Sequence, residues 1–156
     1  MLKRIEIYGF KSFAEKTILN FESQLNGIVG PNGSGKSNVV DAIKWCLGEQ
    51  ALSHIRCKNA QDVIFAGSES KSMLNYCEVS VVFDNSGGVF PIDFQEVEVT
   101  RKLYRSGETE YYINRAPCRL KDIKDLVLNT DYTYYVVAYN YNWRRNDVVS
   151  QSFIGT

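Results

Sequence analysis

The sequence predicts an α/β fold with a mixed sheet, in which a strand–loop–helix unit joins an antiparallel β meander. A glycine-rich loop at 30–37 separates a short apolar run from a segment whose apolar residues recur at helical spacing. Further along, the segments 77–83 and 97–104 alternate apolar and polar residues, and each is followed by a glycine-containing turn. This pattern is typical of neighbouring antiparallel strands.

The composition limits the class of protein. A chain of 156 residues with 44% hydrophobic and 23% charged residues is typical of one globular domain or part of one. The formal net charge is zero, so whole-chain electrostatics gives no indication of a nucleic-acid partner. No apolar run is long enough to span a bilayer, and the N-terminus lacks a secretory apolar region, so we expect a cytoplasmic protein without membrane contact.

Cysteine and histidine show no metal-binding pattern. The four cysteines lie far apart without a CxxC pair, and His54 is the single histidine. We therefore expect no zinc site and expect reduced, mostly buried thiols, as is usual in the cytoplasm.

Three strands are predicted before the glycine-rich loop. Residues 2–8 alternate apolar and polar side chains and end at Gly9, and residues 16–21 form a second short strand. Residues 25–29 are a short apolar run directly before the loop. We expect this run to be a buried strand that leads into the loop.

The remaining elements follow from periodicity and turn residues. A helix is predicted from Ser37 to the stop signal at Gly48, followed by a loop with a short helix over 49–62. The rest is predicted as strands at 77–83, 97–104 and 110–113, turns at 85–88, 105–108 and 114–115, and a short amphipathic helix at 120–128.

The loop from Gly30 to Ser37 matches the pattern GxxxxGK(S/T) at every position. Its glycines allow positive φ, so successive backbone N–H groups can point at phosphate oxygens, and the following helix directs its positive end at the same anion. Lys36 is predicted to contact the β- and γ-phosphates, and the hydroxyl of Ser37 is predicted to bind Mg²⁺. The expected ligand is ATP together with Mg²⁺.

Several segments together resemble one family. Residues 30–38 have the form of the loop found in SMC (structural maintenance of chromosomes), Rad-type and RecF/RecN ATPases and in ABC transporters. The segments that select among these are Gly9-Phe10-Lys11-Ser12-Phe13, 41–50, 62–68, and 111–114 with 119–123. They resemble the N-terminal part of the head ATPase domain of a bacterial or archaeal SMC protein, over about residues 1–128. Residues 129–156 do not resemble the family, and we expect a divergent or non-family tail there.

The resemblance implies the N-terminal lobe of an ABC-type head. In that family, two heads enclose two ATP molecules at the ends of a long coiled coil that organises chromosomal DNA. The implied partners are the C-terminal half of the head, a second SMC head, a kleisin-type subunit and, through the intact complex, DNA. The implied role is chromosome condensation and segregation, in the cytoplasm and in association with the nucleoid.

The resemblance also implies which residues bind the nucleotide. They are Gly30, Pro31, Asn32, Gly33, Ser34, Gly35, Lys36, Ser37 and Asn38. Arg56 falls where SMC heads place an arginine near the nucleotide across the dimer, and an ordinary surface arginine is the alternative. Lys11 and Ser12 are implied to lie near the nucleotide, and a solvated turn is the alternative.

The sequence departs from a complete SMC head at several points. The family's Walker B acidic pair, its Ser-Gly-Gly signature and its switch histidine lie in a C-terminal half that this sequence does not contain. Tyr139 stands where the family's magnesium-binding glutamine would be. Because carboxylates of that half hold Mg²⁺ and orient the attacking water, we assign no catalytic residue and expect no hydrolysis by the chain alone.

Other functions stay open at the level of sequence. A head of a Rad-, RecN- or RecF-type repair protein is the nearest alternative, followed by a non-catalytic binding fragment and a small nucleotide kinase. The tyrosines between 132 and 141 could stack on bases, with simple packing as the alternative. A DNA-contacting face, with a solvated face as the alternative, could be formed by Arg101, Lys102, Arg105, Arg115, Arg119, Lys121 and Lys124.

Overall fold

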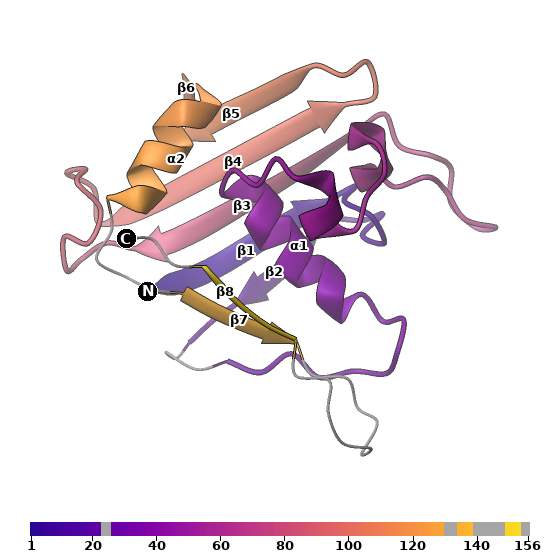
Figure 1. Ribbon diagram of the computed structural model, residues 1–156, viewed down its shortest axis with the longest axis horizontal. Helices are drawn as coiled ribbons and strands as arrows, with labels where there is room; N and C mark the ends of the chain where they lie inside the picture. The colour runs from indigo at the N-terminus through magenta and orange to yellow at the C-terminus, as the bar shows by residue number, and fades with distance from the viewer. Residues whose placement is uncertain (23–25, 130–133, 139–148, 154–156) are drawn as a thin grey trace.

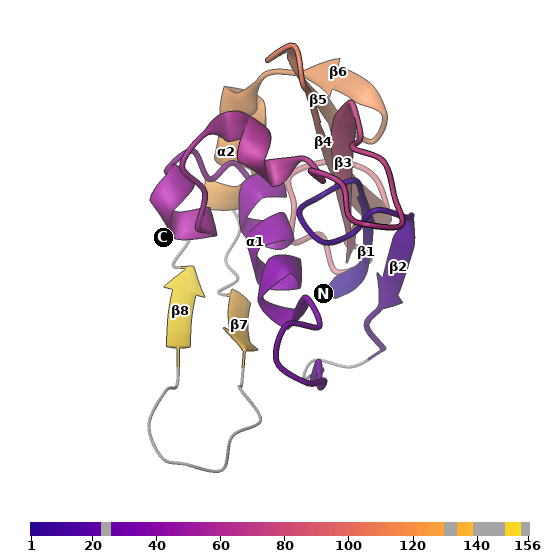
Figure 2. The ribbon, with the colours of Figure 1, turned by 90° about the vertical axis from the view of Figure 1, so that its right-hand side faces the viewer.

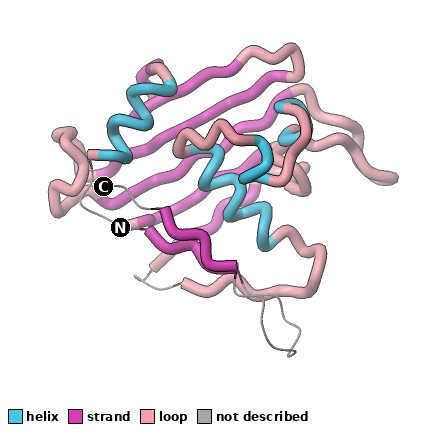
Figure 3. Tube along the Cα trace, viewed as in Figure 1, coloured by secondary structure: helices cyan, strands magenta, loops and turns pink. Residues whose placement is uncertain are grey.

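The computed structural model describes residues 1–22, 26–129, 134–138 and 149–153. The main structural element is a six-stranded sheet, and the helices lie on one side of it (Figures 1 and 3). Its strands are β1 (Leu2–Tyr8), β2 (Thr17–Asn20), β3 (Tyr76–Asp84), β4 (Glu96–Tyr104), β5 (Thr109–Ile113) and β6 (Ala116–Cys118). The strand order is β2-β1-β3-β4-β5-β6, and every neighbouring pair is antiparallel.

The helical elements lie along one side of the sheet (Figure 1). They are α1 (Lys36–Cys46), α2 (Leu120–Leu128) and two short 3₁₀ helices, η1 (Leu52–Ile55) and η2 (Ala60–Val63). A separate two-stranded pair, β7 (Tyr134–Ala138) and β8 (Val149–Phe153), runs antiparallel, and β7 lies beside α1 (Figure 2). Within the described residues, no helix is both long and apolar enough to cross a bilayer.

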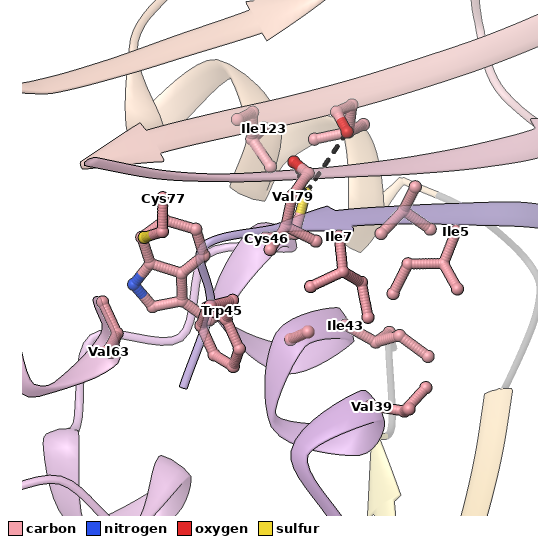
Figure 4. Close-up of a cluster of buried hydrophobic side chains, with 14 of the residues drawn as sticks. Ile5, Ile7, Val39, Ile43, Trp45, Cys46, Val63, Cys77, Val79 and Ile123 are labelled. Carbon is pink, nitrogen blue, oxygen red and sulfur yellow. Dashed lines mark hydrogen bonds between the residues drawn. The ribbon is translucent and has the colours of Figure 1, made fainter. Parts of the chain in front are cut away.

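The core lies between α1 and the sheet. Ile5, Ile7 and Val79 project from β1 and β3 toward α1, which contributes Ile43 and Cys46 (Figure 4). The thiol of Cys46 is fully buried, and its hydrogen is shared between the carbonyl oxygens of Val79 and Val99, both at 3.2 Å. These contacts fix the C-terminal turn of α1 against the two central strands.

The opposite face of the sheet carries polar side chains together with aromatic ones, and no described helix covers it. Lys102 pairs with Glu78 at 2.7 Å, and the hydroxyls of Ser80 and Thr100 share a hydrogen bond of 2.7 Å. The strand register places each of these pairs directly across β3 and β4. Cross-strand pairs of this kind stabilise the pairing of β3 with β4.

Most predicted elements are confirmed, and the α/β class with an antiparallel meander is observed. The predicted strand at 25–29 is wrong, because residues 26–29 belong to no strand and Val29 is 81% exposed. An apolar run becomes a buried strand only where neighbouring strands pair with it. None of the described strands pairs with these residues. All of the described strand pairs are antiparallel.

Thiol titration of the native protein is expected to modify Cys57 and Cys118 but not Cys46 or Cys77. The last two are fully buried, and burial raises the pKa of each thiol to about 12, which suppresses the reactive thiolate. Cys57 and Cys118 are only half-buried. A disulfide-exchange reagent at neutral pH should label two thiols in the folded chain and all four after denaturation, and rapid labelling of four native thiols would contradict this packing.

Candidate phosphate-binding site

The glycine-rich loop has the backbone geometry that its sequence pattern predicts. Gly33 and Gly35 have φ of 81° and 91°, and α1 begins directly after them at Lys36. No side chain caps the N-terminus of α1, and its first turn contains no acidic residue. The first N–H groups of a helix lack intrahelical partners. This end of α1 therefore offers donors and a positive dipole to an anion.

Lys36 reaches back over the loop. Its Nζ donates to the carbonyl oxygens of Gly30 and Pro31, the latter at 2.6 Å. No described carboxylate pairs with it. An ammonium held only by carbonyls can exchange them for phosphate oxygens at little cost, because phosphate forms stronger, charge-assisted hydrogen bonds.

A turn between β1 and β2 brings Lys11 and Ser12 to the start of α1. The turn is fixed by hydrogen bonds from Phe65 N to Gly9 O and from Lys11 N to Val63 O, both 2.7 Å. The hydroxyl of Ser12 accepts from Asn38 Nδ2 at 2.8 Å. A Cβ atom on Gly35 would lie 2.9 Å from the same hydroxyl oxygen. Ser12 therefore touches the last glycine of the loop.

Lys11 and Arg56 meet at a carboxylate that we did not predict as a site residue. Asp41 Oδ2 accepts from Lys11 Nζ at 2.5 Å and from Arg56 Nη2 at 2.6 Å. Arg56 Nη2 also donates to Asn38 Oδ1 at 3.1 Å. Asp41 opens the segment 41–50 that resembles the family, and its spacing of three residues from Asn38 puts both on one face of α1.

The structure thus brings Lys11, Ser12, Asn38 and Arg56 together beside the loop. Ser37 is half-buried in the first turn of α1, and the tip of the loop from Pro31 to Ser34 is exposed. Their contact with a nucleotide stays a prediction. Within the described residues, no cluster of three His, Cys, Asp or Glu side chains is placed to hold a metal ion.

The basic residues considered for a DNA-contacting face do not all lie on one side of the sheet. Arg101 points into the core side, where Nη1 donates to the carbonyls of Trp45 (2.8 Å) and Glu49 (3.1 Å). Its guanidinium lies 4.4 Å from the centroid of the Trp45 ring. Lys102 lies on the opposite face in its pair with Glu78, and Arg105 donates to the Leu74 carbonyl.

The predictions for the last part of the chain lie mostly beyond the described residues. Tyr139, the position compared with the family's glutamine, and Tyr132 and Tyr141 of the tyrosine-rich segment are all outside the described ranges.

Comparison with known proteins identifies the family. Residues 1–134 match the RecF/RecN/SMC N-terminal domain. The chain is 54% identical over 129 residues to the chromosome partition protein Smc of Lactiplantibacillus plantarum and, equally, to that of Bacillus subtilis. Each alignment covers 83% of this chain and 11% of the relative, so the chain spans about a tenth of the length of these proteins.

Solved structures agree with this relationship. One solved structure is described as concerning the ATP-driven dimerization and DNA-stimulated activation of SMC ATPases. It matches this chain with a TM-score of 0.79 and 35% identity, and the match covers 82% of this chain and 78% of the other. An Smc head bound to the C-terminal winged-helix domain of ScpA also has a TM-score of 0.79, with 36% identity, over 82% of this chain and 40% of the other. RecF bound to ATP matches at 22% identity with a TM-score of 0.58, which shows a shared fold alone. The chain belongs to the RecF/RecN/SMC N-terminal domain family, as the resemblance to the N-terminal part of an SMC head predicted.

Proposed function

We propose that this chain is the ATP-binding N-terminal part of an SMC head, which hydrolyses ATP together with a C-terminal part and so serves chromosome condensation and segregation. The observation that carries the proposal is the uncapped N-terminus of α1 behind a complete phosphate-binding loop, where, among the described residues, Lys36 is held by the loop carbonyls of Gly30 and Pro31 and pairs with no carboxylate. Identity of 54% to Smc proteins favours this role over that of a repair protein of the RecF type.

The residues of the loop fit a nucleotide triphosphate. The N–H groups that follow Gly33 and Gly35 would hold phosphate oxygens, and Lys36 would move from the carbonyls of Gly30 and Pro31 onto the β- and γ-phosphates. No acidic residue in the first turn of α1 competes with the phosphates. Mg²⁺ bound with the nucleotide would neutralise its developing charge, and Ser37 supplies a hydroxyl in the first turn as one ligand.

The exposed run before the loop supports a missing partner segment. Ile28 and Val29 are apolar, directly precede Gly30 and are 38% and 81% exposed. Isoleucine and valine are among the residues most often buried in folded proteins. We infer that strands of the C-terminal half of the head pair with residues 26–29 and complete the mixed sheet.

The partners follow from the same proposal. Related structures are described as undergoing ATP-driven dimerization and as binding ScpA, which is consistent with a second head and a kleisin-type subunit as partners of this chain. DNA would be engaged through the intact complex.

We further infer a cytoplasmic, nucleoid-associated location for the protein. We also infer that residues 1–128 form the head segment and that residues 129–156 form a tail outside it.

The test is ATP binding and hydrolysis by this chain, alone and mixed with the complementary C-terminal head segment. We expect binding by the chain and turnover only in the mixture. Hydrogen exchange at the amides of residues 26–29 should slow when the second segment is added. Turnover by the chain alone would instead indicate a self-sufficient enzyme, and absence of both binding and turnover in the mixture would overturn the proposed function.

A further inference from the structure

Asp41 holds a buried negative charge beside the phosphate-binding loop. Its side chain is only 6% exposed and projects from α1. One oxygen, Oδ2, accepts hydrogen bonds from Lys11 Nζ (2.5 Å), Arg56 Nε (3.1 Å) and Arg56 Nη2 (2.6 Å). A buried carboxylate is stable only when it is paired. Here two cations from separate loops perform that pairing.

The two cations depend on the carboxylate in turn. Lys11 and Arg56 converge on the same oxygen atom, so without Asp41 they would face each other as like charges. Lys11 Nζ also donates to the carbonyl of Ile55, the residue before Arg56. Asp41 and Lys11 together therefore hold the short segment that carries Arg56 against α1.

The backbone at both positions is strained. Lys11 and Arg56 have φ of 49° and 55°, in the left-handed region that residues other than glycine rarely adopt. Such conformations persist only where the surroundings enforce them. Because both side chains end on Asp41, this carboxylate is the contact that the two strained residues have in common.

A continuous set of hydrogen bonds links this cluster to the loop. Arg56 Nη2 donates to Asn38 Oδ1 (3.1 Å), and Asn38 Nδ2 donates to Ser12 Oγ (2.8 Å), which borders Gly35. The Arg56 side chain is still 54% exposed, whereas that of Lys11 is 12% exposed. The guanidinium of Arg56 is therefore the cation of this cluster that an incoming anion can reach.

We propose that Asp41 is a positioning residue for nucleotide binding, which acts by holding the Arg56 guanidinium at the side of the phosphate-binding loop. This inference rests on the proposed nucleotide-binding function. The cluster of Lys11, Arg56 and Asp41 has one net positive charge, so it attracts a phosphate while the carboxylate keeps the two cations in place. Asp41 itself needs no contact with the nucleotide.

The test is a double-mutant cycle on the affinity of the chain for ATP with Mg²⁺. Asp41→Asn should weaken binding about tenfold, the loss typical of one charge-assisted hydrogen bond. In the Arg56→Ala background, Asp41→Asn should cause no further weakening, because the group that it positions is absent. A purely structural carboxylate would give the same loss in both backgrounds and would overturn the proposal.

The controls separate this inference from the function on which it rests. Asp125→Asn, an exposed acid on α2, should leave affinity unchanged. Wild-type chain that binds no ATP would contradict the proposed function itself, whereas wild-type binding that Asp41→Asn does not alter would contradict only the role of Asp41. If Asp41→Asn does not fold, Asp41→Glu keeps the charge and moves the carboxylate by one methylene. It should weaken binding only when Arg56 is present, and unchanged binding would overturn the proposal.

Discussion

Replacing Lys36 with alanine is expected to weaken ATP binding about 10- to 100-fold, the range for loss of hydrogen bonds to a charged group. The ammonium of Lys36 reaches the loop carbonyls of Gly30 and Pro31, and no described carboxylate depends on it. Its removal should therefore lower nucleotide affinity while leaving the midpoint of thermal unfolding nearly unchanged. Equilibrium titration with ATP and Mg²⁺, followed by a melting curve of each variant, measures both quantities.

A matched lysine shows whether the effect belongs to the loop. Lys121 lies exposed on α2, outside the loop of Gly30–Ser37. Lys121→Ala therefore removes one positive charge, as Lys36→Ala does, but leaves the loop unchanged. We expect its ATP affinity to equal that of the wild type. Equal affinities for wild type and Lys36→Ala would mean that the loop does not bind the nucleotide.

The largest expected effect on stability is that of Gly9→Ala. Gly9 has φ of 64°, and an added Cβ would lie 2.5 Å from the carbonyl oxygen of Tyr76 and 3.3 Å from Cys77 Cα. Both are backbone atoms of β3, which cannot move aside without breaking the sheet. Strain at this φ and the steric overlap each cost roughly 1–3 kcal/mol, so we expect a loss of about 2 kcal/mol or more in the free energy of unfolding.

Gly87→Ala is the matched control for this change. Gly87 has no atom within 4 Å of an added Cβ, and its φ is not in the left-handed region. Its replacement should change the free energy of unfolding by less than about 1 kcal/mol, and in the stabilising direction. Urea denaturation of the two variants compares them directly, and similar midpoints would show that the close approach of Gly9 to β3 is relieved at no cost.

The sheet could be predicted from the sequence because its strands are bordered by solvent on one face. In β4, the alternation of Val97, Val99 and Leu103 with polar neighbours specifies which residues face α1. The run at 25–29 has one polar residue, Asn26, and does not alternate in this way. Its sequence cannot show whether strands from elsewhere lie beside it, so its burial was predicted wrongly.

The site was predictable only where a local motif defines it. The loop residues follow from a pattern of eight consecutive positions, whereas the contact of Asp41 with Lys11 spans 30 residues and depends on how the turn after β1 docks on α1. Arg101 was considered for a basic surface, although it occupies an inward position between Val99 and Leu103 in β4. That position in the alternation was the available signal that its guanidinium enters the interior.

The contacts at the far end of α1 have a mechanical consequence. Arg101 holds the carbonyls of Trp45 and Glu49, and Cys46 is fastened to β3 and β4, so this end of the helix is anchored to the sheet. The other end carries the loop and has no side-chain cap. The C-terminal end of α1 is therefore held in place by the sheet. We expect any shift that accompanies phosphate binding to occur at the loop end of α1, because the other end is held by the sheet.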